Sequence, residues 1–444
     1  MTDDARRVVF VSQMFPPETG GNASRIHDTA TNLDDEWAVT VLAPPPTLPP
    51  GEFDRSRRRA TTERVDGATV HRLWTWQPTV EDPGMARRLP YYLLFGLHAM
   101  LWLLWNRRRY DAVVTSTPPI STGAPGLLAA ALGTPLVVDV RDLWIDASIS
   151  LGYLEADSAM ARLSRRFQRL VLGAADRITV TTETLGEAVA ERYGPELSAK
   201  TVLLPNGVDT DRFRPHDEPG TPRGGHDDGV AGAVGDGGRV PPPDRPTIVY
   251  TGNLGSAQAL EPCVRAMAHV SSDAVLRLVG GGDVATDLRR LAEACGVEDR
   301  VRVDEPVPRD AVPAVLNDAT LGVAPLEASE TLSYAMPTKC YEYLACGLPT
   351  VVTGRGEIER FAERSGGAVH ADTDPERLAA AFDALLAAPK RREEMTRRGR
   401  KYVVANHDRR ALAGRLGEQL SALVGEGTPR ATAADDDPGS RLAP

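Results

Sequence analysis

Residues 337–352 read PTKCYEYLACGLPTVV. Thr338 to Ala345 predicts a short helix, a Gly-Leu-Pro turn follows it, and Thr350 to Val352 predicts an apolar strand. A helix that leads through a tight turn into a buried, β-branched strand is typical of a parallel sheet covered by helices on both faces. Thr338 is of a residue type that favours the N-cap position, so we expect it to cap the helix.

The same alternation of apolar strands and helices extends along the chain in both directions from this stretch. It is interrupted at residues 217–246, where Gly, Pro and Asp predominate and a disordered insertion is expected. We therefore expect an α/β protein with two facing Rossmann-like domains, residues 1–200 and 201–404, and a cleft between them. The tail, residues 425–444, is also expected to be disordered.

The composition excludes some classes of protein. The chain has 444 residues, and its 61 acidic residues outnumber its 51 basic ones, which argues against a nucleic-acid partner. The four cysteines lack the spacing of a zinc site, so no metal site is expected and a reducing cytoplasm is the expected location. The basic residues include only four lysines, namely Lys200, Lys339, Lys390 and Lys401.

One apolar stretch complicates this expected location. Residues 91–105 read YYLLFGLHAMLWLLW between arginine-rich flanks, and these 15 residues are fewer than the roughly 20 that a transmembrane helix needs. Either a buried helix or a helix in a membrane interface accounts for the pattern, and one face could serve each role. We expect a cytoplasmic protein, with residues 87–109 as a candidate peripheral membrane contact.

Several glycine-rich loops follow predicted strands and precede predicted helices. Backbone amides at such positions bind anions, although a tight turn is the alternative explanation for each loop. Two of these loops in the second half of the chain are more specific than one. The glycines and their neighbours are Gly20 and Gly21, then Gly252, Asn253 and Gly255, and finally Gly281.

Charged residues stand at the end of one predicted strand and at the start of one predicted helix. Arg141 and Asp142 follow a predicted strand, where an arginine suits a phosphate or carboxylate, or else forms a structural pair with an aspartate. Lys339 stands at a helix start, against the helix dipole, which suggests a bound anion nearby. Glu342 shares a face with Lys339 and can accept two hydrogen bonds from a ribose diol, whereas a Lys339–Glu342 surface pair is the alternative.

Five motifs carry a family resemblance: PPETGG, RDLW, PNGVDTDRF, YTGNLG and PTKCYEYLACGLPTVV. Together they resemble family 4 of the retaining glycosyltransferases, which have the GT-B fold. The sequence is most similar to the subgroup of fucosaminyl-type transferases of O-antigen and capsule synthesis. The resemblance covers about residues 6–424, apart from the insertion. The Asp209-Thr210-Asp211 string is expected to be a turn and cap, because metal-binding DxD motifs belong to the other transferase fold.

The resemblance implies a nucleotide-diphospho-sugar donor held mainly by the second domain, and a glycan or polyprenyl-linked acceptor held by the first. Residues 405–424 would form a helix that returns to the first domain. No cofactor is expected, and any divalent cation would be nonessential. The candidate donor-binding residues are Gly20, Gly21, Arg25, Gly252, Asn253, Gly255, Gln258, Gly281, Lys339 and Glu342. The candidate catalytic residues are Arg141, Asp142, Lys339 and Glu342.

The chain departs from the family pattern at three positions. Tyr334 replaces the first glutamate of an E-x7-E pair, Arg141 replaces a histidine, and Gln258 replaces a lysine. The expected reaction is transfer of an N-acetylated or deoxy hexose, with retained configuration, during synthesis of surface polysaccharide or glycoprotein glycans. Two alternatives remain: a non-hydrolysing sugar-nucleotide epimerase, which would need carboxylates and a histidine in the cleft, and a non-catalytic nucleotide-sugar binding protein.

Overall fold

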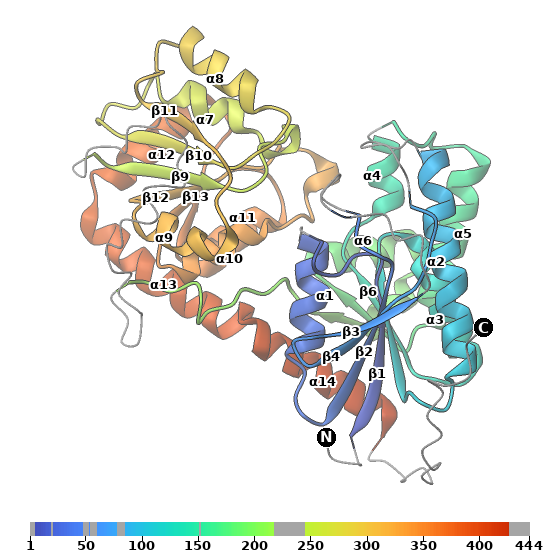
Figure 1. Ribbon diagram of the computed structural model, residues 1–444. Helices are drawn as coiled ribbons and strands as arrows, with labels where there is room; N and C mark the ends of the chain where they lie inside the picture. Colours follow the sequence, from blue (N-terminus) through green and yellow to red (C-terminus); the bar gives the residue numbers. More distant parts are fainter. Residues whose placement is uncertain are drawn as a thin grey trace.

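The computed structural model describes residues 5–18, 21–47, 53, 60–77, 85–150, 152–216 and 245–425. Gly20, almost all of the expected insertion at 217–246 and the tail after Gly425 therefore lie outside the described residues. Figure 1 shows two α/β domains side by side, joined by a linker without regular secondary structure after β8 and by the last helices of the chain.

The first domain is built on an eight-stranded sheet with the order β3-β4-β2-β1-β5-β6-β7-β8. Only the β3–β4 pair is antiparallel, and β3 was not expected from the sequence. Because β8 belongs to this sheet, the sheet extends past the boundary expected at residue 200. The strands are β1 (Arg6–Val11), β2 (Trp37–Ala43), β3 (Thr61–Val65), β4 (Ala68–Arg72), β5 (Ala112–Thr117), β6 (Leu136–Val140), β7 (Arg177–Val180) and β8 (Thr201–Leu203). The helices are α1 (Gly21–Thr31), α2 (Met85–Trp105), α3 (Gly123–Ala131), α4 (Trp144–Ser150), α5 (Ala159–Ala174) and α6 (Glu183–Tyr193).

The second domain has a six-stranded, wholly parallel sheet with the order β11-β10-β9-β12-β13-β14. Its strands are β9 (Thr247–Thr251), β10 (Val275–Val279), β11 (Val301–Asp304), β12 (Leu321–Ala324), β13 (Thr350–Val352) and β14 (Ala368–His370). Its helices are α7 (Leu260–Ala266), α8 (Ala285–Ala294), α9 (Val312–Asn317), α10 (Thr338–Ala345), α11 (Glu357–Ser365) and α12 (Pro375–Leu386). Two doubly wound sheets in one chain confirm the expected fold class.

The last two helices connect the domains. Helix α13 (Pro389–His407) packs against α10 of the second domain, and α14 (Arg409–Val424) packs against α1 of the first. Leu412, Leu416 and Leu420 of α14 are buried in the hydrophobic core of the first domain. Asp408 separates the two helices, and its carboxylate accepts hydrogen bonds from the first backbone amides of α14.

Helix α2 begins at Met85, earlier than the apolar run from which it was predicted. Tyr91, Phe95, Ala99 and Leu103 are buried against the first domain, at the spacing of one helical face. The buried-helix interpretation is therefore confirmed for that face, whereas Leu93, Leu97, Leu104 and Trp105 on the remaining surface are exposed. Within the described part of the chain, no helix combines the length and apolar character needed to cross a bilayer.

Candidate functional site

A cavity of about 530 Å³ lies between the two domains. From the first domain it is lined by the start of α1, including Gly21 and Arg25, and from the second by Thr338 and Glu342 of α10. Arg409, at the start of α14, lines it as well. Because α1 begins at the cavity, its free amide groups and its dipole favour an anionic ligand there. The cavity is therefore the place where predicted residues of both domains meet.

Glu342 is buried, with 7% of its surface exposed, yet it lines this cavity. Its Oε1 accepts a hydrogen bond of 2.6 Å from Nη2 of Arg309, whose guanidinium lies 5.3 Å from the ring centroid of Phe213. The alternative of a Lys339–Glu342 surface pair is wrong, because Arg309 is the ion-pair partner of Glu342. Arg309 was missed from the sequence, since nothing local distinguishes it from the other arginines.

Lys339 lies beside the first glycine loop of the second domain. Its Nζ is 3.6 Å from the ring centroid of Tyr250 and 3.3 Å from Oε1 of Gln258. Burial lowers the pKa of Lys339 to about 7, and no carboxylate among the described residues forms an ion pair with it. Lys339 and Gln258 are therefore brought together as predicted, next to Gly252. An anion bound here would restore the full charge of the lysine.

The two glycine loops of the second domain hold each other. The amide of Gly252 donates to the carbonyl of Val279, and the amide of Leu254 donates to the carbonyl of Gly281. Gly280 has a φ of +156°, and a Cβ there would overlap the carbonyl oxygen of Gly252. The tight-turn alternative therefore explains part of the glycine pattern, because some of the amides expected at a diphosphate bind the neighbouring loop instead.

The N-terminus of α10 differs from the expectation. Thr338 is the first helical residue, and Pro337, whose side chain cannot accept a hydrogen bond, occupies the N-cap. The predicted capping role of Thr338 is therefore wrong. Its side chain lines the cavity instead, directly beside Lys339.

Arg25 lines the cavity, but its guanidinium forms hydrogen bonds within the protein. Its Nε and Nη2 pair with Asp139 at 3.1 and 2.7 Å, while the remaining donors reach Leu204, Pro205 and Asn206. All five N–H groups of Arg25 are thus used within the protein. The sequence led us to expect Arg25 at the donor substrate, and in this structure it has no N–H group left for that role. Arg25 instead fixes the segment after β8 against the end of β6.

Arg141 is not part of an Arg–Asp pair. It donates to the carbonyl oxygens of Thr117 and Pro118, at 3.3 and 2.8 Å, while Asp139 pairs with Arg25. Its buried Nη1 has no hydrogen-bond partner among the described residues. Burial lowers the pKa of Arg141 to about 10, so the side chain remains charged at neutral pH.

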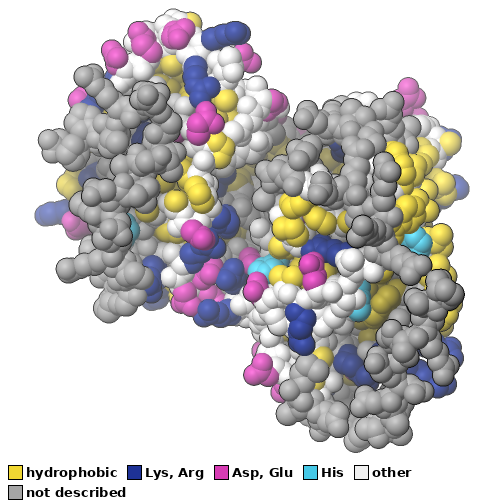
Figure 2. All heavy atoms as spheres, viewed as in Figure 1, with side chains coloured by type: hydrophobic (Ala, Val, Ile, Leu, Met, Phe, Trp, Pro, Cys, Tyr) yellow, Lys and Arg dark blue, Asp and Glu magenta, His cyan; other side chains and the backbone are white. Residues whose placement is uncertain are grey.

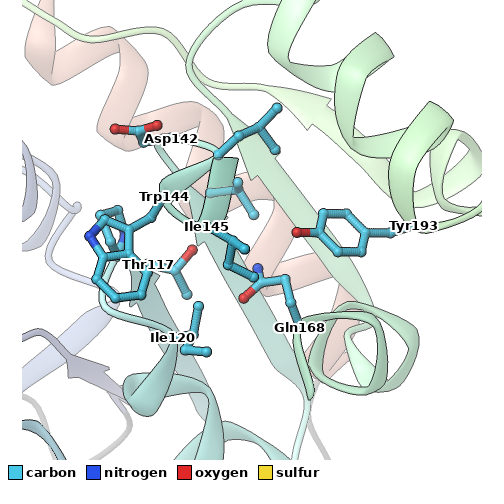
Figure 3. A pocket seen from close by; sticks show the side chains of 10 residues that line it. Thr117, Ile120, Asp142, Trp144, Ile145, Gln168 and Tyr193 are labelled. Carbon is cyan, nitrogen blue, oxygen red and sulfur yellow. The ribbon is translucent and has the colours of Figure 1, made fainter. Parts of the chain in front are cut away.

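Asp142 meets the second domain directly. One of its oxygens accepts a hydrogen bond of 2.7 Å from the hydroxyl of Tyr334, and burial raises the pKa of the carboxyl group. Figure 3 shows Asp142 at a small pocket of the first domain, with Trp144, Gln168 and Tyr193. That pocket holds about 10 Å³, room for one water molecule rather than a sugar.

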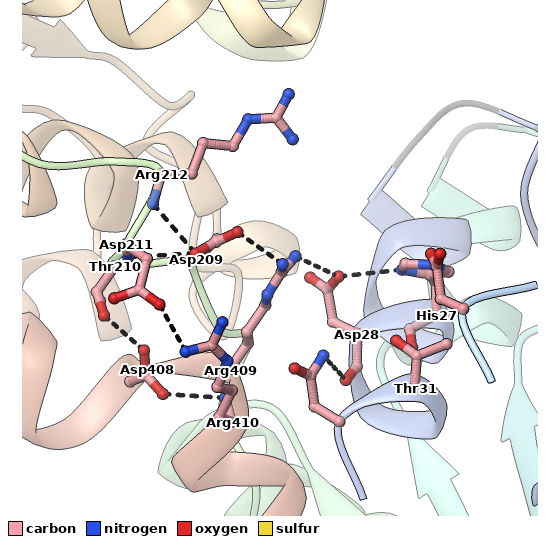
Figure 4. Close-up of polar contacts among 12 residues, drawn as sticks. His27, Asp28, Thr31, Asp209, Thr210, Asp211, Arg212, Asp408, Arg409 and Arg410 are labelled. Carbon is pink, nitrogen blue, oxygen red and sulfur yellow. Dashed lines mark hydrogen bonds and ion pairs between the residues drawn. The ribbon is translucent and has the colours of Figure 1, made fainter. Parts of the chain in front are cut away.

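A network of ion pairs between side chains lies at the hinge between the domains, where linker residues 209–212 meet the start of α14 (Figure 4). Arg409 donates to Asp28 of α1 at 3.0 Å and to Asp209 of the linker at 2.6 Å. The carboxylate of Asp209 also accepts hydrogen bonds from the backbone amides of Asp211 and Arg212. These bonds confirm that the Asp209-Thr210-Asp211 string forms a turn. In the part of the chain that the structure describes, no cluster of side chains has the composition of a metal site.

Comparison with known families agrees with this architecture. Residues 20–207 match the model of a glycosyl transferase 4-like domain, and residues 245–388 match that of the glycosyl transferases group 1. The chain is a family 4 glycosyltransferase with the GT-B fold. It is therefore an enzyme that transfers a hexosyl group, and the two matches correspond to its two domains.

Curated relatives match most of the length of this glycosyltransferase. It is 29% identical to a GDP-mannose-dependent α-(1-6)-phosphatidylinositol monomannoside mannosyltransferase of Mycolicibacterium smegmatis, covering 93% of this chain and 98% of the relative. It is 26% identical to the putative colanic acid biosynthesis glycosyl transferase WcaI of Escherichia coli, covering 72% and 76% of the two chains.

Solved structures share the fold. A sucrose-phosphate synthase of Thermosynechococcus elongatus superposes with a TM-score of 0.68 at 18% identity, covering 94% of this chain and 99% of that one. The Anabaena protein HepE, solved with UDP and glucose, superposes with a TM-score of 0.65 at 15% identity, covering 94% and 100%.

Proposed function

We propose that the interdomain cavity binds a nucleotide-diphospho-sugar, with the ribose held by Glu342 and the diphosphate held near Lys339. The observation that carries this proposal is a buried carboxylate that lines a 530 Å³ cavity shared by both domains. A carboxylate accepts hydrogen bonds from both hydroxyls of a ribose, and the neighbouring lysine lacks a carboxylate partner among the described residues.

The proposed reaction keeps the anomeric configuration of the sugar. The acceptor hydroxyl forms a bond to the anomeric carbon while the bond from that carbon to the diphosphate breaks, and the hydroxyl proton passes to a diphosphate oxygen. Lys339 and Arg141 would stabilise the charge that develops on the departing diphosphate. Asp142 lines a separate small pocket of the first domain, the domain where the acceptor is expected.

The sugar is proposed from two sources that point to different hexoses. The resemblance to fucosaminyl-type transferases favours an N-acetylated or deoxy hexose. The M. smegmatis relative is named for GDP-mannose and a phosphatidylinositol mannoside, which favours mannose and a lipid-linked glycan acceptor. We take GDP-mannose as the first donor to test, because that relative aligns along nearly its whole length.

A membrane contact of the first domain is proposed to present such an acceptor. Leu93, Leu97 and Leu104 are exposed on α2, and the partly exposed Trp74 packs against His98 of this helix, with ring centroids 6.0 Å apart. Arg107, Arg108 and Arg109 follow the helix. Figure 2 shows hydrophobic side chains gathered along the edge of this domain where Figure 1 places α2 and α5. Aromatic and basic residues of this kind favour a lipid interface.

The donor assignment is tested by Glu342→Ala. We expect binding of GDP-mannose, or of whichever nucleotide sugar the wild-type protein prefers, to weaken by about 1.5–3 kcal/mol, because hydrogen bonds to a carboxylate are lost. Isothermal titration with GDP-mannose and UDP-N-acetylhexosamines measures this, and Glu393→Ala on the exposed side of α13 is the control. Unchanged affinity in a folded Glu342→Ala variant contradicts the assignment.

Product analysis separates the activity from its alternatives. Incubation of the donor with a polyprenyl-linked glycan should give a glycosylated acceptor and a nucleoside diphosphate. An epimerised donor would indicate the sugar-nucleotide epimerase, and an unaltered donor would indicate a binding protein.

A further inference from the structure

Tyr334 belongs to a loop of the second domain, but its side chain is buried in the first domain. It lies between the short 3₁₀ turn Glu330–Leu332 and the start of α10. Only 9% of its surface is exposed, and its ring belongs to the hydrophobic cluster of the first domain that contains Leu143. The residue that replaces the family glutamate is therefore an anchor between the domains.

Polar contacts hold this tyrosine at both ends. Its hydroxyl donates to Asp142 at 2.7 Å, and its backbone carbonyl accepts a hydrogen bond of 2.9 Å from the hydroxyl of Thr182. Both partners belong to the first domain, at the ends of β6 and β7. Because the ring is enclosed, the hydrogen bond to Asp142 is shielded from competing water.

A second set of contacts lies beside the tyrosine. Thr184 of α6 donates to Glu357 of α11 at 2.9 Å, and Arg364 of α11 pairs with Glu183 of α6 at 2.8 Å. These groups are more exposed, so each contributes little stability. They are separate from the hinge network around Arg409, so the domains are joined both at the hinge and at this contact.

We propose that Tyr334 is a latch between the domains, a positioning residue that ties Asp142 of the first domain to the donor-binding helix of the second. Lys339 and Glu342 belong to the helix that starts directly after this loop, so movement of the latch displaces them relative to Asp142. The latch itself rests only on the contacts above. Its effect on transfer rests additionally on the proposed function.

The hydroxyl distinguishes a latch from ordinary packing. Tyr334→Phe keeps the ring and removes only the bond to Asp142. We expect hydrogen–deuterium exchange of residues 332–336 and 142–145 to rise about tenfold, and kcat to fall about tenfold, since a bond to a charged group is lost. The Kd for GDP-mannose should change less than about twofold, because the variant leaves Lys339 and Glu342 together on α10 and removes a contact to the first domain only.

Matched variants complete the experiment. Tyr153→Phe removes a hydroxyl from an exposed ring of the first domain and should leave both exchange and kcat unchanged. Asp142→Ala should raise exchange at residues 332–336, and the double variant should add little to Tyr334→Phe if the two groups act through one bond. If Tyr334→Phe fails to fold, exchange in Asp142→Ala alone tests the latch.

Two results overturn the proposal. Exchange in Tyr334→Phe equal to that in the wild-type protein would show that the hydroxyl does not hold the domains. Strictly additive effects of Tyr334→Phe and Asp142→Ala would do the same. Since exchange is measured without substrate, failure of the Glu342 assignment would leave this part of the test intact.

Discussion

Lys339 is enclosed more tightly than a surface lysine. The ring of Tyr250 and the side chain of Gln258 contact its ammonium group, and a Cβ at Gly252 would lie 3.4 Å from Nζ. A guanidinium is larger and planar, so Lys339→Arg should weaken donor binding and transfer by about 1–3 kcal/mol. Measured kcat/KM should fall accordingly, with Lys401→Arg on the exposed side of α13 as control. Full activity of Lys339→Arg would contradict a phosphate-binding role.

The lowered pKa of Lys339 predicts the pH dependence of donor binding. Below a pKa of about 7 the free protein carries the charged ammonium, and above it the lysine becomes neutral. A bound diphosphate favours the charged form, so binding above neutral pH must take up a proton. The Kd should therefore increase between about pH 6 and about pH 9, measured by titration calorimetry. In Lys339→Arg this increase should disappear, because arginine stays charged.

Helix α2 is asymmetric, with one face in the core and another in solvent. Leu97 is 49% exposed on this helix, and Val404 is 42% exposed on α13 of the second domain. Leu97→Glu places a charge on the proposed lipid face, so binding to vesicles that contain anionic lipid should fall by about 2–3 kcal/mol. Val404→Glu is the matched control and should bind as the wild type does. Equal sedimentation of both variants with vesicles would remove the membrane contact.

At the scale of the whole molecule, Arg409 is one of the residues that connect the first domain to the linker between the domains. Arg409 joins Asp28 of α1 to Asp209 of the linker, and Arg410 beside it forms an exposed pair with Asp211. Arg409→Ala leaves two carboxylates without this partner and should lower the free energy of unfolding by about 1–3 kcal/mol. Arg410→Ala should change it by about 0–1 kcal/mol. Urea denaturation compares the two variants, and equal losses would argue against a special role of the hinge.

The sequence was sufficient wherever the signal is local. Strand and helix alternation predicted most strands of both sheets, because hydrophobic periodicity reports directly on which face is buried. The short or exposed strands β3, β8 and β14 were not predicted. The pairing of Lys339 with the glycine loop could also be expected, since parallel strands bring their carboxyl ends to one edge of a sheet. Helix α2 was predicted with both of its faces, although its start was placed several residues too late.

The remaining features depend on partners that are distant in the chain. The sequence shows a charged Arg25 near a glycine loop, but only the tertiary structure shows that Asp139 and the segment after β8 use all its donors. Likewise, the sequence shows Tyr334 only as the residue that replaces a family glutamate. The tertiary structure shows that its hydroxyl donates a hydrogen bond to Asp142 of the other domain. Periodicity and glycine placement are set by neighbouring residues, so the sequence by itself determined the fold class and the positions of Lys339 and Glu342 on one short helix. Ion pairs and domain contacts form only when the backbone brings remote groups within about 3 Å, so the structure alone decided which charges remain available to a ligand.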